Sequence, residues 1–185
     1  MALTESNMIQ LLTKAPDFHL LDVVSGKVLS YDDIKGCKGT LVLFLCNHCP
    51  YVIHVNQELI RIAYDYQSKG IGIVAISSND AVNYPEDGPE NMKLLAKVLP
   101  YPFPYLYDES QEVAKSYEAA CTPDIYLFDG NDLLYYRGRL DDSKPNSGIP
   151  LSGKDLRLAL DLMLRGEPPM NKQYPSAGCN IKWKK

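Results

Sequence analysis

The chain has 185 residues, of which 45% are hydrophobic and 23% charged, with a formal net charge of −4. This is the composition of a globular protein with a sizeable core, and the slight acidic excess argues against nucleic acid as a partner. The N-terminus has no basic start followed by an apolar stretch, and no apolar run approaches the roughly 20 residues of a membrane span. We therefore expect a cytoplasmic protein with no membrane partner.

The first half of the chain predicts a β-hairpin followed by a βαβ unit. The continuously apolar run 41–45 is typical of a strand buried on both faces, and residues 51–67 have helical periodicity up to Gly70. A strand, helix and strand connected in this way should pair in parallel. The expected elements are a short helix at 8–12, strands at 18–22 and 27–29, a short helix at 31–36, a strand at 41–45, a helix at 51–67 and a strand at 71–76.

The second half predicts further helices and an antiparallel hairpin. Residues 152–155 resemble a capping box, which would start the last helix, and the proline-rich tail after Gly166 has no periodicity. The expected elements are a loop at 79–88, a helix at 89–99, a strand at 105–107, a helix at 111–117, strands at 124–128 and 133–137, and a helix from 152 to 165. We expect a single domain over residues 15–165, with a lead-in at 1–14 and a tail at 166–185.

The segment Cys46-Asn47-His48-Cys49 lies between the apolar strand and the long helix, which is the layout of a redox site. Residues three apart on the first turn of a helix are neighbours, so the two sulfurs can meet. The positive end of a helix favours the thiolate. We expect Cys46 to be the exposed, acidic, attacking thiol and Cys49 to resolve the mixed disulfide. Five cysteines, an odd number, do not suggest a purely structural disulfide framework.

The order of these elements resembles the thioredoxin fold over roughly residues 15–165, an α/β fold with a central mixed β-sheet flanked by helices. An N-terminal β-hairpin and an extended C-terminal tail complete the expected architecture. The chain looks most like the redoxin branch, which includes the peroxiredoxins (AhpC/TSA) and the TlpA-type thiol oxidoreductases. The segments that carry the resemblance are Ala15-Pro16-Asp17-Phe18, 28–36, 103–108 with 113–117, and Thr122-Pro123, in order around Cys46 and Cys49.

The chain departs from the peroxiredoxin pattern at two positions. Peroxiredoxins resemble each other in a proline-threonine-cysteine signature. In this chain Val42 stands in the proline position and Cys46 in the threonine position. Cys49 would then take the peroxide-attacking place. The departure favours dithiol-disulfide exchange, with a thiol-dependent peroxidase as the alternative. For the arginine that assists peroxide cleavage in the family, Arg137 or Arg139 is a candidate.

The resemblance also assigns roles around the two cysteines. Thr122-Pro123 stands where the fold places a cis-proline facing the active site, and Thr122 would offer its backbone to an extended substrate chain. Asn47 is expected to contribute to the same substrate-binding surface. We expect His48, as an imidazolium, to stabilise the Cys46 thiolate, the alternative being an exposed loop residue. We expect no cofactor other than a redox-active Cys46–Cys49 disulfide.

Two further cysteines leave alternatives open. Cys121 precedes the expected cis-proline and is a candidate third redox thiol, or a third ligand with Cys46 and Cys49 in a copper or zinc binding module. Cys179 would be a resolving thiol only if the tail folds over the site, and a packed or free thiol is the simpler expectation. The expected partners are protein or small-molecule thiols and disulfides, a thioredoxin-type reductant and, in the peroxidase alternative, peroxides.

Overall fold

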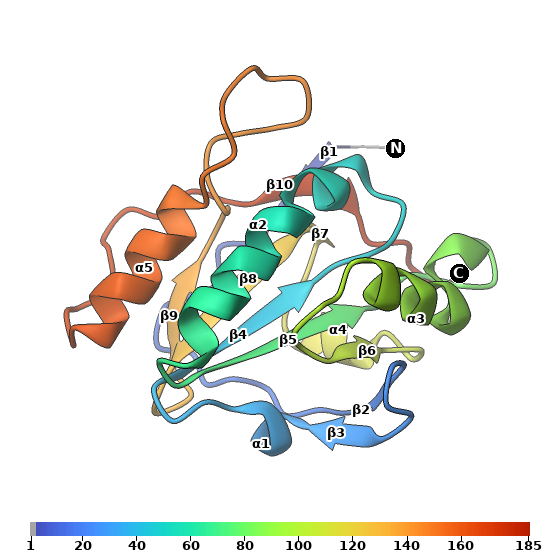
Figure 1. The fold of residues 1–185 in the computed structure, drawn as a ribbon, viewed down its shortest axis with the longest axis horizontal. Helices are drawn as coiled ribbons and strands as arrows, with labels where there is room; N and C mark the ends of the chain where they lie inside the picture. The colour runs from blue at the N-terminus through green and yellow to red at the C-terminus, as the bar shows by residue number, and fades with distance from the viewer. Residues whose placement is uncertain (1–2) are drawn as a thin grey trace.

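The computed structural model describes residues 3–185 and contains a seven-stranded mixed sheet with strand order β3-β2-β6-β5-β4-β8-β9 (Figure 1). Strands β4, β5 and β6 run parallel, and the other neighbours pair antiparallel. The strands are β2 (His19–Asp22), β3 (Val28–Ser30), β4 (Gly39–Phe44), β5 (Ile71–Ser77), β6 (Tyr105–Tyr107), β8 (Asp124–Asp129) and β9 (Leu134–Arg137). This is the thioredoxin-like α/β architecture that the sequence predicted.

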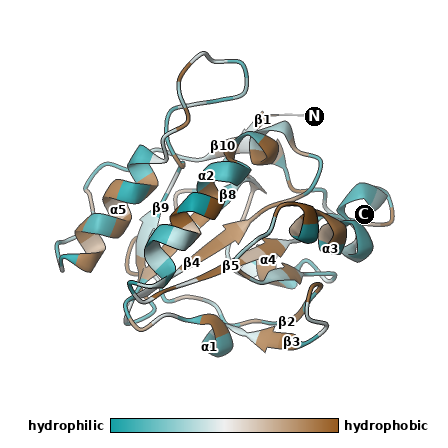
Figure 2. Cartoon of the chain, viewed as in Figure 1, coloured by the Kyte–Doolittle hydropathy of each residue, from teal (hydrophilic) through white to brown (hydrophobic). Residues whose placement is uncertain are grey.

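Helices cover both faces of this sheet because its central strands are apolar on both sides. Along β4, Leu41 and Leu43 face one core, while Val42 and Phe44 face the other, as the alternation of a strand requires. The first core packs against α2, α3 and α5, and the second against α1 and α4. Figure 2 shows β4 and β5 as strongly apolar strands between helices of mixed polarity. The helices are α1 (Tyr31–Ile34), α2 (Pro50–Gln67), α3 (Pro89–Val98), α4 (Glu112–Ser116) and α5 (Lys154–Leu164), with a 3₁₀ turn η1 (Pro85–Asp87).

A second, three-stranded sheet joins the two ends of the chain beside the start of α2. Its order is β1 (Leu3–Glu5), β10 (Ala177–Asn180) and β7 (Cys121–Thr122), all antiparallel. The expectation of a helix at 8–12 is wrong, because residues 6–10 have no regular structure and 11–12 form a turn. The C-terminal tail, which has no periodicity in the sequence, contains strand β10. The partners of β10 are β1 and β7, which lie far away in the sequence, so local patterns do not reveal this strand.

The start of the last helix also differs from the prediction. Gly153 is the N-cap of α5, with φ of 66° and no side-chain capping bond, so the expected capping box is absent. Instead, the Asp141 carboxylate accepts hydrogen bonds from the backbone N–H groups of Ser152 and Gly153, each at 2.7 Å. Within residues 3–185, no helix is both long enough and apolar enough to cross a membrane.

Candidate active site

Cys49 is the N-cap residue of the 18-residue helix α2. Pro50 occupies the first helical position, where its fixed φ suits the helix and its missing N–H costs nothing. The Cys49 carbonyl accepts the first helical bond from Ile53, at 3.0 Å. The Cys49 side chain therefore lies at the positive end of α2, where unpaired N–H groups favour a thiolate.

Cys46 lies in the connection between β4 and α2, not on the first helical turn. Its Sγ lies 3.2 Å from Thr122 Oγ1, and Cys49 Sγ lies 3.2 Å from the Thr122 carbonyl oxygen. Thr122 Oγ1–H can donate to Cys46, and the neighbouring Cys46 thiol favours a thiolate at Cys49. Thr122 thus contacts both cysteine sulfurs.

The hydrogen-bond donors around Cys49 lower its thiol pKa to about 5. The Cys46 thiol has the largest effect, and it outweighs burial, which acts in the opposite direction. The Cys179 thiol and the backbone N–H groups of Val52 and Cys179 add to the lowering. The Thr122 carbonyl, 3.2 Å from Cys49 Sγ, opposes it because a carbonyl accepts only from the protonated thiol. Several donors face this one acceptor, so we assign the thiolate to Cys49.

The expected acidity of the two cysteines is therefore reversed. Cys46 is only 1% exposed, and its pKa is raised by the neighbouring Cys49 thiol, by burial and by the Asp87 carboxylate. The prediction of an exposed, acidic Cys46 is wrong. An acidic Cys46 would have to lie at the start of the helix, but α2 begins at Pro50, four residues after Cys46. All five cysteines are free thiols.

His48 is held by an acidic residue that the sequence did not single out. Its Nδ1 lies 2.6 Å from Oδ2 of Asp87, which is fully buried, and its ring stacks on Tyr84 with centroids 5.9 Å apart. The distance is that of a charge-assisted contact, although the N–H direction is poor for a hydrogen bond. Asp87 lies in the segment 79–88 that was expected to be a loop, and an aspartate in a polar loop does not by itself indicate a functional site. The alternative of an exposed loop residue is wrong about the exposure, since the His48 side chain is only 18% exposed.

Asn47 anchors the turn that carries Asp87. Its backbone N–H donates to Asp87 Oδ1 at 2.7 Å, and its side-chain amide donates to the Glu86 carbonyl at 2.7 Å. Its side-chain oxygen accepts from Tyr105 Oη at 3.2 Å. Both ends of the Asn47 side chain thus have partners within the protein, and its contact with substrate stays a prediction.

The Thr122–Pro123 peptide bond is cis, as the sequence predicted, and Thr122 contacts both Cys46 and Cys49. However, its backbone is not free for a substrate chain. Strand β10 pairs with β7, with Cys179 opposite Thr122 and Asn180 opposite Cys121. The tail of the same chain occupies the position where a substrate strand was expected.

Cys121 is buried next to Thr122, but the alternation of a strand turns its side chain to the opposite face. Its thiol is 3.6 Å from the Pro123 carbonyl, and burial raises its pKa. The candidate arginines also have other partners. Arg137 pairs with Asp124 at 3.0 Å, with both side chains fully buried, and Arg139 pairs with Asp155 at 2.7 Å.

The metal-ligand atoms that converge are not those of the expected copper or zinc module. Among residues 3–185, the group within reach of one ion consists of Cys46, His48 and Asp87, whose ligand atoms lie within 4.8 Å of one another. A sulfur, a ring nitrogen and a carboxylate oxygen form a donor set that suits zinc. Cys121 is not a member of this group.

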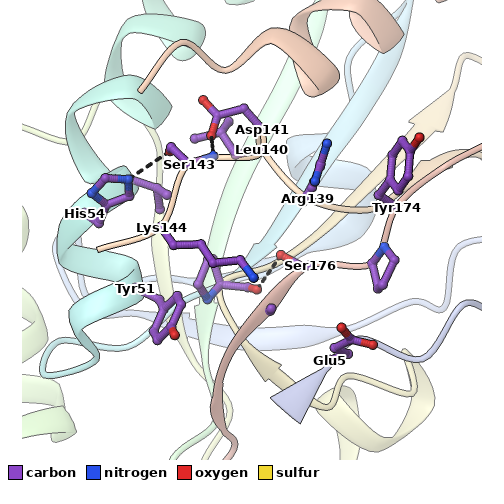
Figure 3. A pocket seen from close by; sticks show the side chains of 14 residues that line it. Glu5, Tyr51, His54, Arg139, Leu140, Asp141, Ser143, Lys144, Tyr174 and Ser176 are labelled. Atoms are coloured by element: carbon purple, nitrogen blue, oxygen red, sulfur yellow. Dashed lines mark hydrogen bonds between the residues drawn. The ribbon is translucent and has the colours of Figure 1, made fainter. Parts of the chain in front are cut away.

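A cavity of about 180 Å³ has Pro123 in its wall. The first turns of α2, the loop after β9 and the tail before β10 line it, and Figure 3 shows Lys144 extending across it. His54 Nε2 contacts Ser143 Oγ at 2.9 Å on its wall. The side chains that line it include Tyr51, His54, Pro123, Arg139, Lys144 and Tyr174.

Comparisons with known proteins agree with this architecture. The AhpC/TSA family model matches residues 11–137. An uncharacterised conserved protein from Geobacillus kaustophilus is 57% identical, with coverage of 100% of this chain and 97% of that one and a TM-score of 0.98. A hypothetical protein from Sinorhizobium meliloti is 44% identical, with 98% of each chain covered and a TM-score of 0.95.

More distant structures share the fold. The thioredoxin domain of a thiol-disulfide oxidoreductase from Bacteroides vulgatus is 21% identical and has a TM-score of 0.59. That alignment covers 70% of this chain and 88% of the other. A search of curated proteins finds no match.

Proposed function

The chain belongs to the AhpC/TSA family, and from this premise we propose that it is a thiol-disulfide oxidoreductase that uses Cys46 and Cys49. The observation that carries the proposal is that both sulfurs contact the residue before the cis-proline: Cys46 Sγ lies 3.2 Å from Thr122 Oγ1, and Cys49 Sγ lies 3.2 Å from the Thr122 carbonyl oxygen. Thr122 thus holds an acidic thiol at the N-cap of α2 beside a second thiol that can close a disulfide with it. Such a pair would serve thiol redox homeostasis.

The geometry supports Cys49 as the attacking thiolate. Attack on a substrate disulfide forms a bond between Cys49 Sγ and one substrate sulfur, and the other substrate sulfur leaves as a thiolate. Cys46 then attacks Cys49 Sγ, the substrate's second thiol leaves, and a Cys46–Cys49 disulfide remains. A thioredoxin-type reductant would return this disulfide to two thiols.

The burial of the site bears on the substrate class. Cys46 is 1% exposed and Cys49 is fully buried, and β10 covers the edge of β7 beside them. A folded protein substrate would reach these sulfurs only if β10 moved aside. We therefore propose small disulfides or flexible peptides as substrates, with the cavity beside Pro123 taking the group attached to the sulfur.

The test measures disulfide reduction and peroxide consumption side by side for the wild type and for Cys46→Ser, Cys49→Ser and Cys121→Ser. Disulfide turnover should need Cys49, should fall in Cys46→Ser, and should survive Cys121→Ser. Cys37→Ser, at an exposed thiol, is the control. Turnover that persists in Cys49→Ser would refute the proposal.

A second candidate function is a thiol-dependent peroxidase, favoured by the low pKa of Cys49. In this reaction the Cys49 thiolate attacks one peroxide oxygen, the other oxygen leaves as hydroxide or alkoxide, and Cys49 becomes a sulfenic acid. Peroxide turnover that needs Cys49 but not Cys46 would favour this function over disulfide exchange.

The third candidate, a copper or zinc site, is supported by the convergence of Cys46, His48 and Asp87. Metal analysis of the purified protein and of Asp87→Asn tests it. Stoichiometric metal that protects Cys46 from alkylation, and that is lost in the variant, would favour this role.

A further inference from the structure

We propose that Cys179 is a third redox-active thiol of this site, held by β10 where a substrate strand would otherwise lie. This inference rests on the proposed function, because it needs Cys49 to react with disulfides. It adds a second resolving thiol from the tail and gives the β7–β10 pairing a role in the reaction.

The strand register places Cys179 toward the reactive cysteines. Residues directly opposite each other on an antiparallel pair have side chains on the same face, and Cys179 is opposite Thr122. The Thr122 side chain faces Cys46, with 3.2 Å between Oγ1 and Sγ. Cys179 therefore points to the same face. Cys121, one residue away on β7, points to the other.

Gly178 makes this close pairing possible. A Cβ at Gly178 would lie 2.0 Å from the Thr122 carbonyl oxygen, closer than any side-chain carbon can approach. The missing side chain lets β10 lie directly against the residue whose carbonyl contacts Cys49 Sγ at 3.2 Å. The glycine thus brings the neighbouring Cys179 within contact of the site.

The Cys179 side chain lies on the face that carries Cys49. Cys179 is opposite Thr122, whose carbonyl contacts Cys49 Sγ, and it is only 5% exposed within the same buried cluster as Cys46 and Cys49. Burial raises the pKa of the Cys179 thiol, so Cys179 stays a thiol until a leaving substrate thiolate takes its proton.

The reaction balances with a disulfide substrate as the oxidant. The Cys49 thiolate attacks the substrate disulfide, forms a mixed disulfide and releases one substrate thiolate, which takes the Cys179 proton. The Cys179 sulfur then attacks Cys49 Sγ and breaks its bond to the remaining substrate sulfur, which leaves as a thiolate. The substrate gains two electrons, and the protein keeps a Cys49–Cys179 disulfide.

The experiment removes the competing thiol and asks whether Cys179 replaces it. Cys46→Ser and the double variant Cys46→Ser/Cys179→Ser are treated with hydroxyethyl disulfide, and Cys49 is followed by peptide mass spectrometry. In Cys46→Ser, the adduct on Cys49 should decay about tenfold faster or more than in the double variant, because only the single variant has a neighbouring thiol to resolve it. A Cys49–Cys179 disulfide should appear in its place.

A further variant keeps the thiol and moves the strand. Cys46→Ser/Gly178→Ala retains Cys179 but pushes β10 away from Thr122, so its adduct should persist as in the double serine variant. Cys46→Ser/Cys37→Ser is the thiol control and should behave like Cys46→Ser. Circular dichroism confirms that each variant is folded.

The outcomes separate this inference from the proposed function. An adduct on Cys49 that persists equally with and without Cys179, or a disulfide from Cys49 to Cys121, overturns the role of Cys179 and leaves the proposed function standing. A Cys49 that forms neither an adduct nor a disulfide in any variant overturns the proposed function, and this inference with it.

Discussion

At the scale of single residues, the reactivity of the site depends on which sulfur is ionised. Donors around Cys49 lower its pKa to about 5 from an ordinary value of 9.0. The ultraviolet absorbance of the thiolate should therefore rise as the pH passes through about 5, and Cys49→Ser should abolish that step. A thiolate that forms only near the ordinary value would contradict the assignment.

Cys46→Ser extends this prediction, because the Cys46 thiol is the strongest single cause of the low Cys49 pKa. A serine hydroxyl has a shorter reach than a thiol, so the Cys49 titration should move to higher pH by about one unit, the loss of roughly one charge-assisted hydrogen bond. The absorbance titration measures the shift, and Cys37→Ser should leave it unchanged.

His48 should influence the redox potential of the Cys46–Cys49 pair. Removing it takes away the shortest contact of the buried Asp87 carboxylate, whose charge already raises the Cys46 pKa. The dithiol form should then become less stable, so we expect His48→Ala to lower the reduction potential by roughly 20 mV, about 1 kcal/mol. Equilibration with a glutathione buffer measures the change. His19→Ala, at an exposed histidine, is the control, and an equal shift there would exclude a local effect of His48.

At the scale of elements, the loop after β9 supplies charge to the cavity beside Pro123. Lys144 extends across this cavity (Figure 3), so it should favour substrates with a carboxylate near the disulfide. We expect Lys144→Glu to raise KM for oxidised glutathione about fivefold, roughly 1 kcal/mol, and to leave KM for neutral hydroxyethyl disulfide unchanged. An equal rise in KM for both substrates would show that the substitution distorts the cavity instead of acting through its charge.

Elements with local signals could be predicted from the sequence, and elements made by distant contacts could not. The strand over 41–45 and the helix over 51–67 were predicted within two residues, because periodicity and flanking glycine act locally. Strand β10 has no such signal, since its partners are Thr122 and the residues of β1. For the same reason the sequence favoured Cys121 as the third thiol, although strand alternation brings Cys179 to the site. Asp87 was missed because only the fold brings it to His48.

At the scale of the whole molecule, a buried ion pair connects β9 to the start of β8, directly after the cis-proline. Arg137 on β9 pairs with Asp124 on β8, and its guanidinium lies 4.0 Å from the centroid of the Tyr126 ring. Asp124 also accepts from the backbone N–H of Ala120, which directly precedes β7. One oxygen of Asp124 and Nε of Arg137 have no partner, so the burial of these charges is only partly compensated.

Breaking this pair should destabilise the fold strongly and in a pH-dependent way. Arg137→Met leaves a buried carboxylate without its cation, and we expect a loss of about 3–5 kcal/mol in the free energy of unfolding near neutral pH, measured with urea. Arg165→Met, which breaks a surface pair with Glu167, should cost no more than about 1 kcal/mol.

The pH dependence follows from the pKa of Asp124, which burial raises to about 6 even though Arg137 lowers it. Without Arg137, the folded-state pKa should rise further above the unfolded-state value, so the folded variant binds a proton that the wild type has already released. Relative to the wild type, folding of the variant therefore becomes less favourable as the pH rises above about 6. The loss in Arg137→Met should accordingly be larger at pH of about 8 than at about 5. A loss that is equal at both values would mean that Asp124 stays ionised in the variant, held by partners other than Arg137.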